Sequence, residues 1–558
     1  MANIDGSGQP SGAGSPAAMF PRLTAAEMAR VARHGRTRHV QAGEVLVERG
    51  DLARRFFVVV SAELEITGAF GHTDDVITVL GERQFTGEIN MLTGRPGFVR
   101  IRVKQAGDLV EVEQERLLAL VQTDSELGEV LLRAFIFRRV EMIARGLADA
   151  VLIGSNHSAG TLRIKEFLTR NGHPHAYVDL ERDSGVQELL DRFQVSADDV
   201  PILICRGTSV LRNPTNEQIA DCLGLNEPID PQQVRDVVVI GAGPAGLGAA
   251  VYGASEGLDT VVVEVNAPGG QAGSSSKIEN YLGFPTGISG QDLAARAYVQ
   301  AQKFGAQMII AKAATRLGCD GQPYTIEIDG GTTILTRAII IASGAQYRRL
   351  PIEALSQFEG VGVYYGATFV EAQWCGGDEV VVIGGGNSAG QAAVFLSQSA
   401  SHVHMLIRSG ELAASMSRYL IRRIEDSRSI TVHTHTELDT VEGTDHLDRV
   451  VWRNNRTGAT RTLAIRHVFV MTGALPNTAW LRGCVVLDAK GFIKTGPDLS
   501  ADDLHGARWP LARLPFLLET SLPAVFAVGD VRSGNIKRVA SAVGEGSITV
   551  AFVHQLRR

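Results

Sequence analysis

The sequence has little cysteine, no CxxC pair and no long hydrophobic run, and these absences exclude several classes of protein. Five cysteines are scattered over 558 residues, at Cys205, Cys222, Cys319, Cys375 and Cys484. Such scatter is unlike a secreted disulfide framework or a zinc ribbon, and we predict no metal site. No apolar stretch reaches the ~18–20 residues that cross a bilayer, so no membrane span is expected. The net charge of -7 provides no basic field that would recruit nucleic acid or an anionic membrane.

What remains is the composition of an ordinary globular protein, with 44% hydrophobic and 21% charged residues. A chain of this length is too long to fold around a single hydrophobic core, so we expect three or more compact units. Residues 1–18 are rich in Gly, Ser and Pro and lack the basic start and apolar centre of a signal peptide, which predicts a disordered leader. On these grounds we predict a cytoplasmic protein.

Residues 19–147 alternate short β-rich runs with glycine and charged turns, and two helical patterns follow, which predicts a β-roll closed by helices. Phe85-Thr86-Gly87-Glu88-Ile89 resembles the start of the phosphate cassette of cyclic-nucleotide-binding domains. The resemblance implies a pocket at Gly87 and Glu88. That family places an arginine nine residues after the glutamate, where this chain has Gly97. Arg95 or Arg100 could substitute. We favour a regulatory or dimerising shell that has lost its ligand, with binding of a cyclic-nucleotide effector as the alternative.

Residues 148–226 alternate strand and helix in the order βαβαββα, including a helix over Val186–Phe193. The order resembles the thioredoxin or glutaredoxin fold, with Val200-Pro201 at the place of that family's cis-proline. The redox CxxC of the family is replaced by Ser155-Asn156-His157-Ser158. Hydroxyl groups cannot exchange disulfides, so we interpret Ser155 and Ser158 as helix caps and the segment as a docking or spacer module.

A complete dinucleotide fingerprint begins at Val237-Val238-Val239-Ile240. This apolar strand leads into Gly241-Ala242-Gly243-Pro244-Ala245-Gly246, and a second strand ends in Glu264, 23 residues after Gly241. The first glycine permits a tight turn, the second lets the backbone approach a pyrophosphate, and the third allows close helix packing. The terminal acid stands where a ribose-binding carboxylate belongs.

A second fingerprint, Gly384-Gly385-Gly386-Asn387-Ser388-Ala389, follows the strand Val380–Ile383 about 143 residues later. Two such units predict two different dinucleotides, which is typical of a flavoprotein with a pyridine-nucleotide site. We therefore expect a multidomain chain in which a β-roll and a thioredoxin-like α/β domain precede two Rossmann-like domains. The expected boundaries are 233–347 with 480–558 for FAD and 348–479 for NADPH.

From about Arg235 to Gln555 the chain resembles the bacterial thioredoxin reductase family. The motifs that carry this resemblance include Gly269-Gly270-Gln271, Ile278–Pro285, Thr472–Asn477 and Ala527-Val528-Gly529-Asp530-Val531. The resemblance implies FAD, NADPH, a homodimer and a set of cofactor-binding positions. Those implied for FAD are Gly241, Gly243, Pro244, Ala245, Gly246, Glu264, Gly270, Gln271, Asn280, Ala342, Gly344, Gly529, Asp530, Arg538, Val539 and Ala540. Those implied for the pyridine nucleotide are Gly384, Gly386, Asn387, Ser388, Ala389 and Arg408.

The residues after the second nucleotide-domain strand favour NADPH over NADH. An acid at this place would repel a 2′-phosphate, but Arg408 stands there and no acid occurs before Glu411. Relatives have two further basic residues nearby, where this chain has Ser409 and Ala413. The preference for NADPH is therefore expected to be modest.

The redox pair of thioredoxin reductases is missing. Their Cys-Ala-Thr-Cys corresponds to Gly366-Ala367-Thr368-Phe369, and we interpret Cys375 as an ordinary buried or surface cysteine. We therefore expect no cysteine pair for electron relay and no catalytic side chain. The hypothesis is an NADPH oxidoreductase in which FAD is reduced at N5 and passes electrons to an unidentified acceptor, such as oxygen, a quinone-like molecule, ferredoxin or a partner's disulfide. The alternatives are a ferredoxin–NADP reductase-type enzyme, a thioredoxin-disulfide reductase, and a cyclic-nucleotide-regulated redox sensor.

Overall fold

The computed structural model describes residues 16–556 except 53, 71–72, 89, 94–95, 145–149, 156–157, 181–198, 206–208, 276–277, 360, 368, 414–415, 445 and 482. These residues group into two compact units. The first contains Met1–Ser155, Ile164–Pro228 and Val299–Ile310, and the second contains Asn156–Arg163, Ile229–Tyr298 and Ala311–Arg558. Within the described residues, no helix combines the length and hydropathy needed to cross a bilayer.

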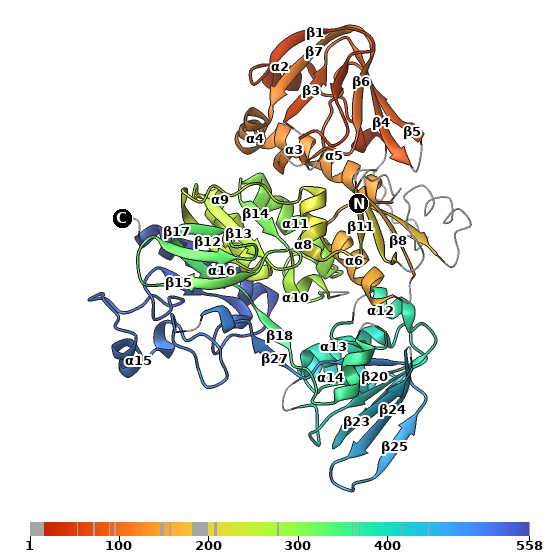
Figure 1. The fold of residues 1–558 in the computed structure, drawn as a ribbon, viewed down its shortest axis with the longest axis vertical. Helices are drawn as coiled ribbons and strands as arrows, with labels where there is room; N and C mark the ends of the chain where they lie inside the picture. The colour runs from red at the N-terminus through yellow and green to blue at the C-terminus, as the bar shows by residue number, and fades with distance from the viewer. Residues whose placement is uncertain are drawn as a thin grey trace. The chain divides into compact units, whose positions relative to one another are not determined.

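The first unit opens with a β-roll of two antiparallel sheets, ordered β1-β7-β3 and β2-β6-β4-β5 (Figure 1). Strand β3 (Arg55–Val59) shows why the roll forms, because its side chains alternate between two cores. Phe56 packs in a cluster with Phe85 and Phe135, whereas Phe57 faces the interior of the roll. The other strands are β1 (Arg36–Val40), β2 (Val45–Val47), β4 (Glu63–Phe70), β5 (Thr73–Leu80), β6 (Arg100–Gln105) and β7 (Gly107–Glu113).

Helices close the roll, as the sequence predicts. The long helix α5 (Ser125–Ala144) carries Phe135, and α4 (Gln114–Thr123) precedes it. The shorter helices of this region are α1 (Pro16–Met19), α2 (Ala25–Ala32) and α3 (Asn90–Thr93). The β-rich N-terminal domain that the sequence predicts is therefore confirmed.

A four-stranded sheet in the order β11-β10-β8-β9 follows in the chain. Its elements are β8 (Ala150–Gly154), α6 (Ala159–Arg170), β9 (Ala176–Asp179), β10 (Ile202–Cys205), β11 (Ser209–Arg212) and α8 (Asn216–Leu223). The Val200-Pro201 peptide bond is cis, and the hydroxyl of Ser158 accepts from the Thr161 N–H at 3.4 Å. The helix expected over Val186–Phe193 lies outside the described residues, as do Asn156 and His157. The thioredoxin-like assignment stays a prediction.

The second unit contains a mixed sheet with the order β13-β12-β17-β16-β15, in which β28 pairs with β17. Strands β12, β13 and β28 run parallel to their neighbours, and residues 237–240, 261–263 and 525–527 in them are apolar and buried, as expected for strands covered on both faces. Helices α9 (Pro244–Ser255) and α16 (Val539–Leu556) pack against each other. The strands are β12 (Val234–Ile240), β13 (Thr260–Glu264), β15 (Ala314–Gly318), β16 (Tyr324–Ile328), β17 (Thr333–Ile341) and β28 (Val525–Ala527).

A second, five-stranded parallel sheet has the order β19-β26-β20-β21-β22. It carries α13 (Asn387–Leu396) and α14 (Arg418–Glu425), and an antiparallel meander β23-β24-β25 lies in the same stretch of chain. The strands are β19 (Val363–Tyr364), β20 (Glu379–Ile383), β21 (His402–Leu406), β22 (Ile430–His433), β23 (Thr436–Gly443), β24 (Leu447–Asn454), β25 (Thr460–Leu463) and β26 (His467–Val470). The expected pair of dinucleotide-binding α/β folds is therefore present.

Two short strands connect the two sheets of this unit (Figure 1). Strand β18 (Ala345–Tyr347) pairs antiparallel with β27 (Ala474–Pro476). Beside this ribbon the Asn477 amide donates to the Ser343 carbonyl at 2.8 Å, and the Ser343 hydroxyl donates to the Asn477 carbonyl at 2.9 Å. The other α-helices are α10 (Gly270–Gly273), α11 (Gly290–Lys303), α12 (Phe369–Trp374) and α15 (Ala501–Gly506). Strand β14 (Gln307–Ile310) belongs to the first unit.

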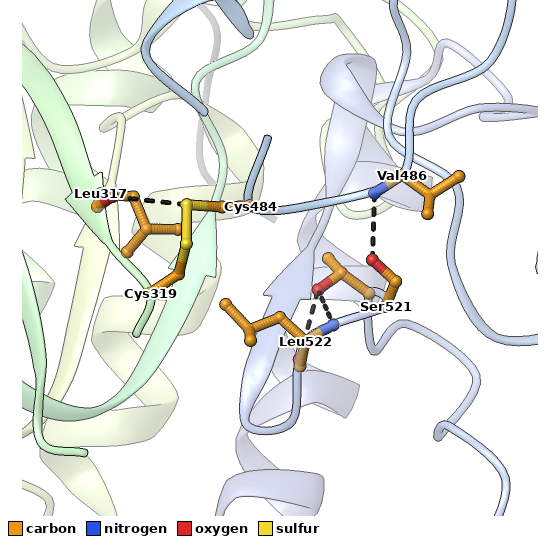
Figure 2. Close-up of a disulfide and its surroundings, with 7 residues drawn as sticks. Leu317, Cys319, Cys484, Val486, Ser521 and Leu522 are labelled. Carbon is orange, nitrogen blue, oxygen red and sulfur yellow. Dashed lines mark hydrogen bonds between the residues drawn. A yellow bond between two sulfur atoms is a disulfide. The ribbon is translucent and has the colours of Figure 1, made fainter. Parts of the chain in front are cut away.

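The second unit contains a cysteine pair that the sequence did not suggest, whereas the expectation of no cysteine pair for electron relay stays a prediction. Cys319 and Cys484 form a disulfide (Figure 2). Their Cα atoms lie 5.9 Å apart. Cys319 directly follows strand β15, and Cys484 lies in the chain that returns from the second sheet. The two residues are 165 positions apart, so no local motif reveals the pair. Cys205, Cys222 and Cys375 are free thiols.

Candidate dinucleotide-binding sites

The first glycine-rich turn joins β12 to α9 in a backbone conformation that only glycine adopts readily. Gly241 has a φ of 102°, and a Cβ atom there would lie 2.4 Å from the carbonyl oxygen of Ala342. At Gly246 a Cβ would lie 1.8 Å from the Gly241 carbonyl. Both glycines therefore let α9 begin directly against the turn.

The backbone around Gly243 is open in the way a bound pyrophosphate requires. Gly243 is the N-cap of α9, Pro244 is its first residue and Ala245 follows. A Cβ on Gly270 would lie 3.0 Å from the Gly243 Cα, so two glycines face each other with no side chain between them. The N–H groups at the start of α9 have no intrahelical acceptor and attract an anion. This open backbone surface, formed by residues 241–246 and Gly270 and called the first cradle, fits the phosphates of a dinucleotide.

Glu264 at the end of β13 holds the turn in place. Its carboxylate accepts from the Ala242 N–H at 2.7 Å and from the Asn266 N–H at 2.9 Å. The side chain is buried, and these bonds orient it at the mouth of the turn. The spacing in the sequence predicts a ribose-binding role for this acid. The two hydrogen bonds show that its carboxylate also holds the backbone of the turn.

Helix α16 begins with Val539 and Ala540 and crosses α9 at close range. A Cβ on Gly546 would lie 2.2 Å from the Ala245 carbonyl, so the contact needs glycine. Arg538 precedes the helix, is exposed, and donates to the Lys537 carbonyl at 3.0 Å.

Asp530 sits in the turn that follows β28, and burial is the main cause that raises its pKa. The N–H of Gly529 donates to Glu545 at 2.7 Å. Arg532 donates to the same carboxylate at 2.7 Å, and the Asn535 amide donates to it at 3.0 and 3.1 Å. Sequence reasoning missed Glu545. An acid in the middle of a largely apolar helix is the signal that could have revealed it.

Of the remaining residues implied for the first site, some lie near the first glycine-rich turn and one lies in an exposed bend. Gln271 donates its side-chain amide to the Ala345 carbonyl, and Ala342 and Gly344 lie in the chain between β17 and β18. Asn280 lies in an exposed bend, and no hydrogen bond among the described residues ties it to the cradle.

The second glycine-rich turn repeats the geometry of the first. Gly384 has a φ of 139°, and a Cβ there would lie 2.4 Å from the Met471 carbonyl. Gly386 is the N-cap of α13, and the Asn387 side chain accepts from the Ser417 N–H at 2.8 Å. Ser388 is exposed on the first turn of the helix, and Ala389 is buried beneath the turn.

Arg408 is exposed in the loop after β21. The Asn455 side chain donates to the Arg408 carbonyl at 3.3 Å, and the N–H of His435 donates to the Ser409 carbonyl at 3.0 Å. The backbone of the loop is thus fixed while the Arg408 guanidinium faces solvent. A solvent-facing guanidinium can pair with a 2′-phosphate.

The positions that correspond to the family's redox cysteines flank the start of α12. Tyr364 ends β19, Gly366 lies in the following bend, and Phe369 is the first residue of the helix. Thr368 lies outside the described residues. Cys375 is buried and donates its thiol to the Glu371 carbonyl at 3.0 Å. Burial raises the pKa of Cys375 to about 11, so the thiol is protonated and unreactive at neutral pH.

In the N-terminal roll, Gly87 and Glu88 lie beside a cavity of about 690 Å³. Glu88 pairs with Arg139 at 3.3 Å, and Arg100 forms a bidentate ion pair with Glu48 at 2.9 Å. Arg95 lies outside the described residues. Arg139 is a contact that the sequence did not suggest.

Two family models match the chain. Residues 235–546 match the pyridine nucleotide-disulphide oxidoreductase model, and residues 37–124 match the cyclic nucleotide-binding domain model. The chain is 31% identical over 318 residues to thioredoxin reductase of Mycoplasmopsis pulmonis, covering 57% of this chain and 95% of that protein. It is also 31% identical over 359 residues to NADPH-dependent thioredoxin reductase 3 of Arabidopsis thaliana, covering 61% of this chain and 64% of that protein.

Solved structures give the same result. The thioredoxin reductase of Lactococcus lactis is 28% identical, covers 57% of this chain and 98% of its own, and superposes with a TM-score of 0.51. The thioredoxin reductase of T. acidophilum is 27% identical, with coverages of 58% and 99% and a TM-score of 0.51.

Proposed function

The chain belongs to the pyridine nucleotide-disulphide oxidoreductase family, and from this premise we propose that it is an FAD-dependent NADPH oxidoreductase that passes electrons to an external acceptor without a dithiol beside the flavin. The thioredoxin reductase family uses FAD and NADPH. Bound FAD supplies two-electron chemistry that connects the nicotinamide to the acceptor. The domain boundaries given above, the homodimer and the cofactor positions are part of this proposal.

The bare approach of Gly243 to Gly270 is the observation that carries the FAD assignment. The start of α9 would receive the pyrophosphate, and Glu264 would receive the adenosine ribose. Asp530 would contact the ribityl side, and the N–H groups at the start of α16 would face the pyrimidine edge. A Cβ at Gly241, Gly246 or Gly270 would lie 3.0 Å or less from a neighbouring backbone atom, and this need for glycine supports the fit.

The second glycine turn and Arg408 support the NADPH assignment. Gly384 and Gly386 leave the start of α13 open to a pyrophosphate. Arg408 has no acidic neighbour before Glu411 in its loop, so a 2′-phosphate would meet attraction and no repulsion.

Three observations support the absence of a dithiol relay: the residues at the two family cysteine positions, the state of Cys375, and the location of the disulfide. Gly366 and Phe369 cannot form a disulfide, and Cys375 is a buried, protonated thiol. The Cys319–Cys484 disulfide lies elsewhere on the sheet. Gly318 pairs with Thr325, which pairs with Leu335. Leu335 is six residues, or roughly 20 Å, along β17 from Ile341, where the first cradle begins.

The test is acceptor choice by the purified chain reconstituted with FAD. We expect NADPH to bleach the absorbance of the oxidised flavin and to be consumed in the presence of oxygen, a quinone or ferredoxin. Thioredoxin disulfide should leave the rate unchanged. A chain that cannot be loaded with flavin, or that reduces thioredoxin disulfide at a comparable rate, would refute the proposal. The variant Cys319→Ser serves as a matched control, because disulfide reduction through that pair would be lost in it.

A further inference from the structure

We propose that the cavity of the N-terminal β-roll binds an uncharged, largely apolar small molecule and not a cyclic nucleotide. The cavity has a volume of about 690 Å³, which is in the range of sites for drug-sized ligands. It lies wholly within the first unit, between the strands of the roll, residues 86–88, 91 and 97–99, and helix α5.

Apolar side chains from four strands and from the segment before β6 form a large part of the cavity walls. Representative members are Leu46, Ile66, Ile77, Leu80, Phe98 and Ile101. Burying a ligand against such walls is favourable in proportion to its apolar area. A sugar or a phosphate placed against these apolar side chains would leave hydrogen-bonding groups without partners there, which costs free energy.

The position at which relatives have the arginine that pairs with the phosphate is a glycine in this chain and has no side chain. Gly97 replaces the arginine found in relatives, and its N–H donates to the Asp51 carbonyl at 2.9 Å while its carbonyl accepts from Gly50 at 3.0 Å. The nearby guanidinium of Arg100 is held by both oxygens of Glu48. A phosphate at this place would therefore find the Gly97 backbone bonded to the main chain of Gly50 and Asp51, and the Arg100 guanidinium bonded to Glu48.

The glutamate that would hold a ribose hydroxyl is already engaged. One Glu88 oxygen accepts from the Asn90 N–H at 3.0 Å, and the other pairs with Arg139 at 3.3 Å. Both side chains of this pair are 13% exposed or less. A ribose would have to displace a shielded ion pair, and the freed charges would be costly at this depth.

The buried Arg138 is also committed, although it lies at the cassette. Its guanidinium donates to the carbonyls of Met19, Phe85 and Gly87 at 3.0, 3.0 and 2.7 Å, and it stacks on Phe85 at 4.9 Å. Burial lowers its pKa to about 9. The Arg138 guanidinium therefore donates to backbone carbonyls at the cassette, and these donors are not available to a bound anion.

The charge of the cavity lining also favours an uncharged ligand over an anion. Five acidic side chains and four arginines line the cavity, so the described lining carries a small excess of negative charge. Of the arginines, Arg36 and Arg55 are paired with Glu111 at 3.2 and 3.7 Å. An anion would gain little on entry, whereas a neutral ligand is indifferent to this balance.

The experiment uses the FAD-loaded full chain, so that the dinucleotide cradle is filled, and the neutral fluorescent probe N-phenyl-1-naphthylamine. Gly97 lines the cavity, and a Cβ there would have one neighbour within 4 Å, the Asp51 carbonyl oxygen at 3.8 Å. The variant Gly97→Phe should therefore fold and fill the cavity. We expect saturable binding of the probe to the natural chain and about tenfold or more weaker binding to Gly97→Phe. Cyclic AMP and cyclic GMP should not displace the probe.

Equal flavin content and circular dichroism of the two proteins serve as the folding control. Probe binding that is absent, or unchanged in Gly97→Phe, would overturn the proposal because the probe would then have no site in the cavity. Displacement by cyclic AMP would overturn it as well. In that case Arg95→Ala tells whether Arg95 supplies the counter-charge, and loss of displacement in this variant identifies a nucleotide site.

Discussion

The backbone N–H of Gly529 donates to the carboxylate of Glu545 at 2.7 Å, so a side chain of α16 fixes the turn that carries Asp530. Hydrogen bonds to a charged group contribute about 1.5–3 kcal/mol each. We expect Glu545→Ala to raise the Kd for FAD about tenfold to a hundredfold, measured by flavin fluorescence on equilibrium dilution.

The exposed Gln555 lies on the same helix and provides the control, since Gln555→Ala should retain FAD as the natural chain does. An unchanged Kd in Glu545→Ala would show that the turn keeps its shape without the carboxylate. Glu545→Gln keeps an acceptor for Gly529 but loses the charge that Arg532 meets, and we expect an intermediate Kd.

The disulfide joins two segments that are 165 residues apart in the chain. Closing a loop of this length restricts the unfolded chain, and such bonds contribute about 2–5 kcal/mol. We expect Cys319→Ala to shift the unfolding transition of the second unit to lower urea concentration, followed by flavin release. Cys319→Ala combined with Cys484→Ala should behave like either single variant. The free Cys222 provides a control, and an effect of Cys222→Ala as large as that of Cys319→Ala would contradict this assignment.

His433 makes the stability of the nucleotide domain depend on pH. Its ring lies 3.1 Å from His404, and burial is the main cause that lowers the pKa of His433 from 6.5 to about 4. Between these values the unfolded chain binds more protons than the folded one, so stability falls as the pH falls from about 6.5 to about 4. We expect His433→Asn to weaken this dependence in urea titrations. The comparison variant is His446→Asn at an exposed histidine, and an equal change in that variant would contradict the prediction.

Arg139 joins the β-roll to the following segment within the first unit. It donates to Glu88 at 3.3 Å and to the Gly172 carbonyl at 2.9 Å, and it stacks over Phe98 at 4.8 Å. Breaking a shielded pair costs about 3–5 kcal/mol. We expect Arg139→Ala to increase amide hydrogen exchange in both α5 and the chain around Gly172.

If exchange rises only near Glu88, the link to Gly172 is energetically unimportant. Glu88→Gln added to Arg139→Ala should restore part of the lost protection, because no unpaired carboxylate then remains. The exposed pair Arg133–Glu129 provides the surface comparison, and Arg133→Ala should change exchange little.

The sequence predicted best where function depends on neighbours in the chain. The turns at Gly241 and Gly384 follow from local strand, glycine and helix signals, and Glu264 lies at a fixed spacing from the first of them. It predicted poorly where a contact spans the fold. Glu48, just after β2, engages Arg100 at a separation of 52 residues. Glu545 bonds to a turn sixteen residues away. No periodicity in the sequence predicts either contact.

The disulfide encloses more than a stretch of sheet. Everything between Cys319 and Cys484, including the whole parallel sheet with β20 and β21, lies within one covalent ring. A protease that cuts this ring once would therefore release nothing. The two fragments would migrate as a single species until a thiol reductant separated them.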